Sequence, residues 1–253
     1  MIDTHCHIDF KEYNKNREEV ISRAKKKLNA IINSGATLGG NRRTLKLVDE
    51  YKGFIYGTLG FHPVNASKAD YNIIEQAFKE INENIDKAVA VGETGLDFHH
   101  IEDIGARNRQ IKVFRSFIDI SNEYELPVVI HARDAELKAL ELIKEYSRDT
   151  DVIFHCYGGD LQTLNKIIEE SYYISFSTII CYSDYHKELV ENTPVHNILT
   201  ETDSPYISPF KGQKNEPVFV EETVKKIVEL KSMSLKDVDK ITEKNAKKVF
   251  NLR

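Results

Sequence analysis

The chain has 253 residues, of which 41% are hydrophobic and 30% charged, with a formal net charge of −5, as in an ordinary globular protein. The negative balance argues against a protein that binds nucleic acid through its overall field, but it leaves room for a local basic patch. Three widely separated cysteines without a Cys-x-x-Cys pair argue against a disulfide framework and against a thiolate zinc site.

The sequence lacks two features that would place the protein outside the cytoplasm or in a membrane. The N-terminus has no basic-then-apolar signal peptide, and no apolar run approaches the roughly 18 residues of a membrane span. Together with the cysteine usage, which fits a reducing compartment, this predicts a cytoplasmic protein that makes no membrane contact.

The chain begins with a short apolar segment, residues 1–9, that carries two histidines. Side chains alternate faces along a strand, so His5 and His7 point the same way and Cys6 points the other. Two imidazoles on one face can chelate one metal ion. A lone His-x-His pair is more often incidental, so the interpretation depends on the rest of the chain.

Strand-like and helix-like segments then alternate along the whole sequence. Further strands are predicted at 36–40, 53–60, 88–92, 126–130, 152–154, 172–176 and 197–200. Helices are predicted at 16–34, 44–51, 71–84, 104–124, 136–146, 161–170, 183–192, 216–230 and 235–250, and Ser234 with Asp237 forms a capping box for the last. This alternation favours one domain over 1–253, an α/β fold of the (β/α)8 TIM-barrel type, over a doubly wound open sheet.

A barrel fold predicts where the polar residues that follow the strands should lie. Active sites of such barrels lie at the C-terminal ends of the strands. Residues with metal-binding or catalytic side chains occur at or just after such ends: His5, His7, His62, Glu93, His131, His155 and Asp203. We therefore expect them to meet at one mouth although they are far apart in sequence.

Ligand chemistry narrows the kind of site. Histidine and carboxylate without cysteine suit Zn, Mn, Fe, Ni or Mg. Four histidines and two carboxylates exceed the needs of one tetrahedral ion and suit two ions that share a bridging carboxylate, for which Glu93 is the natural choice. Asp203 would bind a metal ion and orient or deprotonate the attacking water.

Six short motifs then match a known family in order: Asp3–His7, Gly60–Pro63, Gly92–Asp97, Pro127–Arg133, His155–Gly159 and Glu201–Pro205. On these residues the whole chain resembles the TatD-like metal-dependent hydrolases, a deoxyribonuclease-type branch of the amidohydrolase superfamily. The resemblance implies a TIM barrel, two divalent metal ions (Mg, Mn or Zn) and hydrolysis of phosphodiester bonds in DNA, often as an exonuclease. It also implies one ion held by His5, His7, Glu93 and Asp203, and another held by Glu93, His131 and His155.

The chain departs from the family pattern at two points. Gly158 stands where the family usually has serine, which concerns a small loop contact. Lys214 stands where family members often have arginine, and lysine offers phosphate a point charge in place of a bidentate fork.

Other residues are assigned around the ligands. His62, Arg133 and Lys214 are expected to contact substrate, although Arg133 is nearly as well explained by an internal salt bridge. Glu201 is expected to support the site through hydrogen bonds. Three aromatic residues are expected near the mouth of the barrel: Tyr157, Tyr206 and Phe210. Each could stack on a base or pack within its own loop, and the sequence does not decide between these roles.

The leading function is therefore a deoxyribonuclease with DNA as its partner and no obligate protein partner. The same ligands also serve a hydrolase of another ester, such as RNA, aminoacyl-tRNA or a small phosphoester, because a fold does not fix a function. A metal-stabilised scaffold without catalysis is the third alternative, and the intact ligand set argues against it.

Overall fold

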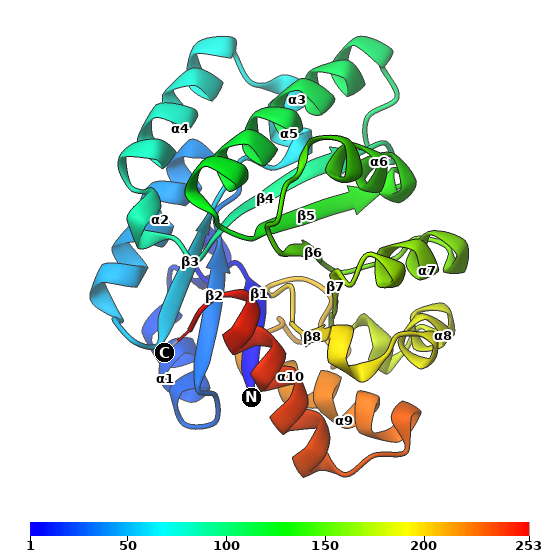
Figure 1. Cartoon of the computed structure of the whole chain (residues 1–253). Coiled ribbons are helices and arrows are strands. Elements are labelled where there is room, and N and C mark those ends of the chain that lie inside the picture. The colour runs from blue at the N-terminus through cyan, green and yellow to red at the C-terminus, as the bar shows by residue number, and fades with distance from the viewer. Residues whose placement is uncertain (253) are drawn as a thin grey trace.

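The strands form one parallel, nearly closed barrel. The computed structural model describes residues 1–252, and in this part of the chain eight parallel strands pair in sequence order (Figure 1). They are β1 (Ile2–Cys6), β2 (Ala30–Ser34), β3 (Ile55–Leu59), β4 (Ala90–Asp97), β5 (Val128–Arg133), β6 (Val152–Phe154), β7 (Tyr173–Phe176) and β8 (Ile198–Thr200).

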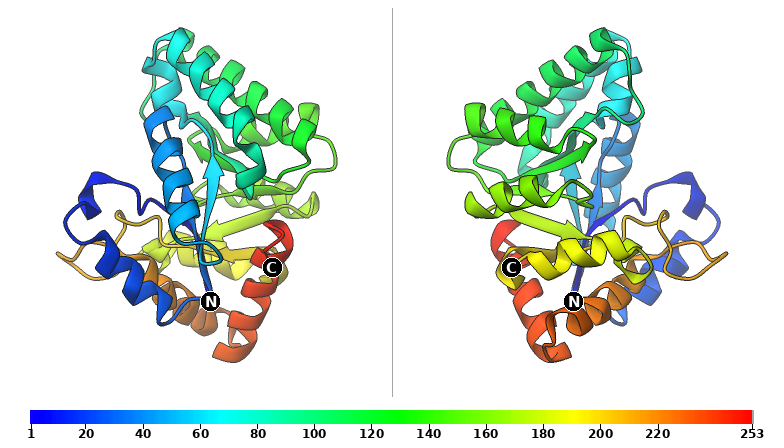
Figure 2. Two further views of the ribbon diagram at one scale, coloured as in Figure 1. Left: turned by 90° about the vertical axis from the view of Figure 1, so that its left-hand side faces the viewer. Right: turned by 90° about the vertical axis from the view of Figure 1, so that its right-hand side faces the viewer.

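Helices surround the strands on the outside, as the two side views show (Figure 2). They are α1 (Arg17–Lys25), α2 (Leu38–Glu50), α3 (Pro63–Lys68), α4 (Tyr71–Glu83), α5 (Ile104–Tyr124), α6 (Glu136–Tyr146), α7 (Leu161–Glu169), α8 (Asp184–Asn192), α9 (Val220–Lys231) and α10 (Leu235–Val249). Within residues 1–252, no helix combines the length and the apolar character needed to cross a membrane.

Contacts between β1 and the end of β8 close the barrel. The hydroxyl of Thr4 donates to the carbonyl of Thr200 at 3.0 Å, and Thr200 in turn donates to the carbonyl of Ile2 at 3.1 Å. Beyond β8, the amide of Asp203 donates to the carbonyl of His5 at 3.0 Å. These contacts confirm the predicted (β/α)8 barrel and bring Asp203 next to the histidines of β1.

The barrel interior is filled at its N-terminal end. Small and branched residues from successive strands, among them Ile32, Ala90 and Val129, are buried in one cluster with Ala246 and Phe250 from the end of α10. Alternating inward side chains of this kind make a barrel a packed core and not a pore. Only the C-terminal end of the strands is then left for polar side chains.

Two predicted elements in the first fifth of the chain were wrong. The segment 36–40, which was expected to be a strand, leads into α2 and forms its first residues. The segment 16–34, which was expected to be one helix, forms the helix α1 in its first half and the strand β2 at its end. All residues of β2 are buried, so this segment has no solvent-exposed face. A short apolar run of this kind shows neither helical nor strand periodicity. The helical spacing that begins at Val20 and Ala24 was therefore assumed to continue through it, which gave one helix that was too long.

Two further differences concern the segments that come after strands. The short helix α3, which begins with Pro63, was not predicted. Strand β4 runs on to Asp97, so Glu93 lies within a buried strand and not at its tip. Most later elements agree with prediction to within a residue or two. The predicted cap of α10 is also present, because the amide of Asp237 donates to the hydroxyl of Ser234 at 3.1 Å.

Candidate metal centre

Six predicted ligands lie together at the C-terminal ends of the strands. We call them the ligand cluster: His5, His7, Glu93, His131, His155 and Asp203. They come from β1, β4 and β5 and from the residues that follow β1, β6 and β8. His5, His7, Glu93 and His155 are buried, whereas His131 and Asp203 are partly exposed.

The two histidines of β1 point the same nitrogen toward the centre. The Nε2 atoms of His5 and His7 lie 3.2 Å apart. The Nδ1 atom of His7 lies 3.0 Å from the carbonyl oxygen of Ser34, and that of His5 lies 3.2 Å from the Ser34 hydroxyl. A carbonyl oxygen can only accept, so Nδ1 of His7 carries a proton, and Nε2 is the atom that faces the centre and would bind a metal ion after losing its own proton.

Glu93 lies between two groups of histidines. Its Oε2 atom is 3.5 Å from Nε2 of His5 and 3.6 Å from Nε2 of His7. Its Oε1 atom is 3.1 Å from Nδ1 of His131 and 3.0 Å from Nε2 of His155. One carboxylate therefore presents an oxygen to each group, which is the arrangement of a bridging ligand.

Carboxylates behind the histidines fix which ring nitrogen faces inward. Asp97 places Oδ2 3.0 Å from Nε2 of His131, so that Nδ1 of this ring faces Glu93. Glu201, which is fully buried, places Oε1 3.5 Å from Nδ1 of His155 and accepts a hydrogen bond from Ser175. Partners of this kind orient metal-binding imidazoles and raise their basicity.

Asp203 is held by the segment after β8. Its backbone is left-handed, with φ of 53°, and its Oδ1 atom lies 3.5 Å from Nε2 of His7 and 3.8 Å from Nε2 of His5. The neighbouring Thr202 donates through both its amide and its hydroxyl to buried Asp3, at 3.0 and 2.6 Å. Asp3 thus ties the segment that carries Asp203 to β1.

The charges in the cluster shift the ionisation of its members. Burial would raise the pKa of Glu93, but the positive charge of His155 and the hydrogen bonds from His131 and His155 outweigh it and hold this pKa well below its usual range. Burial would lower the pKa of His7, but the hydrogen bond with Asp203 and the charges of Glu93 and Asp203 raise it to about 9. The centre therefore favours anionic carboxylates and attracts positive charge.

The polar atoms of the site fit divalent cations. Oε2 of Glu93, Nδ1 of His155 and Oε1 of Glu201 are buried and have no hydrogen-bond partner among residues 1–252. The ligand atoms of His5, His7 and Glu93 all lie within 4.8 Å of one another, and so do those of His62, Glu93 and His131. Imidazole nitrogens and carboxylate oxygens that converge on one point suit a metal ion, because a cation can take the place of the protons that would otherwise lie between them.

His62 differs from the cluster in its protonation. The amide of Val64 donates to Nδ1 of His62 at 3.2 Å, so in the neutral ring Nε2 carries the proton. Burial lowers the pKa of His62 to about 3, which keeps the ring neutral. Nε2 lies 3.5 Å from Oε1 of Glu93. Although His62 is close enough to be a ligand, it presents a hydrogen-bond donor to the centre.

The other predicted substrate contacts lie around the rim. Arg133 is exposed at the end of β5. Lys214 is exposed in the segment between β8 and α9, where its ammonium contacts the carbonyl of Glu12 and lies 5.1 Å from the centre of the Tyr13 ring. Tyr157 is buried and donates its hydroxyl to the carbonyl of Asp160, so this ring packs in the protein.

Sequence reasoning assigned no role to two residues that orient the cluster. Asp97 closes the Gly92–Asp97 motif, and its contact with His131 depends on β4 running past Glu93, which was not predicted. Ser34 ends β2, the strand that was placed inside a helix. A carboxylate four residues after Glu93 was a usable signal for Asp97, because alternation in a long strand puts both on one face.

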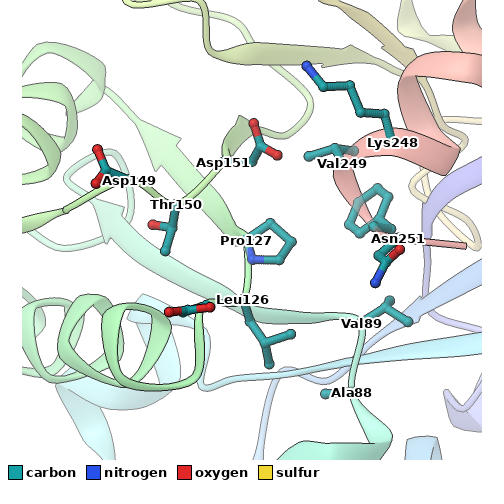
Figure 3. A pocket seen from close by; sticks show the side chains of 12 residues that line it. Ala88, Val89, Leu126, Pro127, Asp149, Thr150, Asp151, Lys248, Val249 and Asn251 are labelled. Atoms are coloured by element: carbon teal, nitrogen blue, oxygen red, sulfur yellow. The ribbon is translucent and has the colours of Figure 1, made fainter.

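A pocket of about 360 Å³ lies at the opposite end of the barrel (Figure 3). Its lining comes from the segments that precede β4, β5 and β6 and from the end of α10. Catalytic residues of such barrels come from the C-terminal ends of strands, whereas the N-terminal face serves stability. We assign this pocket no chemistry.

Comparison with known proteins is consistent with this geometry. Residues 2–251 match the family model described as TatD related DNase. An uncharacterized metal-dependent hydrolase of Methanocaldococcus jannaschii is 42% identical over 252 residues, which cover 100% of this chain and 97% of that protein. Human deoxyribonuclease TATDN3 is 27% identical, with 99% of this chain and 94% of the human protein covered. The crystal structure of a TatD homologue from Escherichia coli, 27% identical, superposes with a TM-score of 0.91 over 100% of this chain and 98% of the other.

Proposed function

The chain belongs to the TatD-related DNase family of metal-dependent hydrolases, and from this premise we propose that it cleaves phosphodiester bonds in DNA as an exonuclease with two divalent metal ions. The observation that carries the proposal is the position of Glu93, whose two carboxylate oxygens face two different pairs of histidines. One shared carboxylate between two nitrogen-rich groups supports two ions in preference to one. Ions held by these residues would supply an activated water molecule and would offset the charge that develops on the phosphate.

Asp203 is the proposed general base. Burial would raise its pKa, but the hydrogen bond with His7 and the positive charge of His7 lower it, so the carboxylate is anionic at neutral pH. An anionic carboxylate can accept the proton of a water that attacks phosphorus, while the bond from phosphorus to the leaving sugar oxygen breaks. Its fixed backbone holds it against the histidines of β1, so it needs little rearrangement to act.

His62 is the proposed donor to the phosphate. Its neutral ring carries a proton on Nε2, which is on the side of Glu93. A neutral N–H group can bind a phosphate oxygen and strengthen that bond as negative charge accumulates in the transition state. At the rim, Arg133 and Lys214 supply positive charge for the neighbouring phosphates of the strand.

The decisive experiment combines metal analysis with cleavage of a defined substrate. Purified wild-type protein and Asp203→Asn are analysed for bound metal and tested on a 5′-labelled DNA oligonucleotide, on the matching RNA and on bis-p-nitrophenyl phosphate. Two metal equivalents, with stepwise shortening of DNA that Asp203→Asn abolishes, support the proposal. Bound metal with cleavage of RNA alone would move the activity to another ester, and protein that binds no metal would refute the proposed chemistry.

Rim charges allow a separate test of the DNA part of the proposal. Arg133→Ala should weaken binding of DNA at every sequence and lower the slope of log affinity against log salt by about one unit. Lys79→Ala removes an exposed charge from α4 on the outside of the barrel and should leave the slope unchanged. Equal salt dependence of the three proteins would exclude Arg133 from the DNA path.

A further inference from the structure

Two aromatic rings lie between the ligand cluster and solvent, next to His7. Phe10 stacks on the imidazole of His7, with ring centres 4.5 Å apart and planes 20° apart. Tyr206 meets Phe10 edge to face, with centres 6.2 Å apart. Phe10 is partly exposed and Tyr206 is 52% exposed. We call these two rings the aromatic step.

Polar contacts, most of them partly buried, hold the backbone beneath Phe10. The guanidinium of Arg17 donates to three successive carbonyl oxygens, those of Ile8 at 2.8 Å and of Asp9 and Phe10 at 3.0 Å each. The carboxylate of Asp9 is buried and is paired with Arg43. The turn that presents Phe10 is therefore fixed by side chains and does not depend on the ring itself.

A second set of contacts holds Tyr206. The amide of Tyr206 donates to the carbonyl of Asp203 at 3.0 Å. The side chain of Asn215, which is fully buried, donates to the carbonyl oxygens of Tyr206 at 2.6 Å and of Thr202 at 2.9 Å. Tyr13 donates its hydroxyl to the carbonyl of Asn215 and joins the two loops. An exposed ring on such a restrained backbone is already ordered for contact with a ligand.

Neighbouring aromatic residues do not share this arrangement. Tyr157 is buried, and Phe210 lies edge to face on Phe219 with ring centres 5.0 Å apart. The aromatic step instead starts at a predicted metal ligand and ends in solvent. Exposed Lys11 and Lys214 lie on the same two loops and add positive charge, which favours an anionic ligand over an apolar protein partner.

We propose that the aromatic step binds the nucleobase of the nucleotide whose phosphate is cleaved at the ligand cluster. This inference rests on the proposed function, because it assumes a nucleotide phosphate bound at the ligand cluster, beside His7 and Asp203. The Phe10 and Tyr206 rings offer a base attached to that nucleotide an aromatic surface that begins at His7. Stacking on aromatic rings tolerates any base, so the step gives affinity and position without sequence preference.

Fluorescence gives a readout that is independent of cleavage. The chain has no tryptophan, so Tyr206→Trp introduces a single indole at the aromatic step. Titration of the metal-loaded protein with dTMP should quench this indole, whereas 2-deoxyribose 5-phosphate, which lacks the base, should not. Phe10→Leu in the same background should weaken the dTMP response, with unchanged metal content as evidence that His7 is still in place.

Kinetics with a matched pair of oligonucleotides completes the test. The pair differs only in whether the terminal nucleotide to be removed carries thymine or is abasic. Tyr206→Ala should raise KM for the thymine substrate by roughly 5- to 150-fold, the loss expected for one base–aromatic stack, and leave the abasic substrate unchanged. Tyr206→Phe keeps the ring and should behave as wild type.

The outcomes separate this inference from the proposed function. DNA cleavage with the same KM for both oligonucleotides in Tyr206→Ala and wild type, together with no selective quenching by dTMP, overturns the aromatic step and leaves the nuclease intact. Selective quenching by dTMP in a protein that cleaves no DNA supports the aromatic step and refutes the nuclease. A Tyr206→Ala variant that loses only thermal stability means that the ring packs its own loop.

Discussion

Oδ2 of Asp97 lies 3.0 Å from Nε2 of His131 and turns the other ring nitrogen toward Glu93. Burial would raise the pKa of Asp97, but the hydrogen bonds from His131 and from the backbone and side chain of His100 lower it, so the carboxylate is anionic. The charge favours the ring tautomer with a proton on Nε2. That tautomer leaves Nδ1 free for a metal ion.

Asp97→Asn should therefore reduce metal affinity while leaving the fold intact. The amide keeps the size of the side chain but loses its charge, and loss of such a partner typically costs about 10- to 100-fold in affinity. The measurement is metal binding in competition with a chromophoric chelator. Asp134→Asn is the matched control, since Asp134 contacts His99 at 2.9 Å on the surface. Equal affinities of Asp97→Asn and wild type would contradict the role of Asp97.

Replacement of His62 should separate catalysis from metal binding. His62→Ala removes the proposed N–H donor and should lower kcat by about 10²-fold, the scale of one lost transition-state donor, with metal content unchanged. His131→Ala removes a ligand and should lower both metal content and kcat. If His62→Ala loses metal as His131→Ala does, His62 is a ligand and its assigned tautomer is wrong.

The metal-free protein should become less stable as pH rises from about 6.5 to about 9. The pKa of His7 is raised to about 9, and that of His155 is also raised because the charge of Glu93 outweighs the effect of burial. A folded-state pKa above the unfolded value stabilises the protein fully below about 6.5, and this stabilisation disappears as pH passes through the folded value. For His7 it amounts to about 3 kcal/mol.

Thermal unfolding in EDTA across this range checks the sign. The midpoint should fall toward pH 9 in wild type and fall less in His7→Gln. His62, with a pKa lowered to about 3, acts in the opposite sense, but only below about pH 6.5. Added metal should raise the midpoint most at high pH, where fewer protons compete for the imidazoles. A midpoint that rises from pH 6.5 to 9 without metal would contradict the raised pKa values.

The sequence contained enough information for the barrel because most of its strands are short, apolar and followed by a metal-binding side chain. The predicted strand at 152–154 and helices at 104–124 and 136–146 coincide with β6, α5 and α6. Strand β2 was missed because a segment that is buried on both faces has no polar alternation to distinguish it from the end of a helix.

The ligand cluster was predictable for a different reason. Its members belong to different strands, and a closed barrel brings the strand ends together whatever the loop lengths. The contact of Asp97 depends on how far β4 extends, so the carboxylate four residues after Glu93 is a signal only for a strand that runs past Glu93. The contacts of Arg17 were not predictable, because they depend on how one turn folds back on its own carbonyl groups. Such details are fixed by packing in three dimensions and have no periodic signal in the sequence.

Close backbone packing beneath Glu93 gives the last prediction. A Cβ atom added at Gly60 would lie 2.3 Å from the backbone carbon of Gly92 and 2.6 Å from the backbone oxygen of Glu93. Neither atom can move without displacing β4, so Gly60→Ala should lose about 3 kcal/mol of stability and should weaken metal binding. Gly53→Ala is the control, since φ there is 77° and no heavy atom of residues 1–252 lies within 4 Å of the new Cβ. It should cost about 1–2 kcal/mol from backbone strain and retain metal, as measured by urea unfolding without metal and by metal titration. Wild-type metal affinity in Gly60→Ala would mean that β4 tolerates displacement and that Glu93 does not depend on this contact.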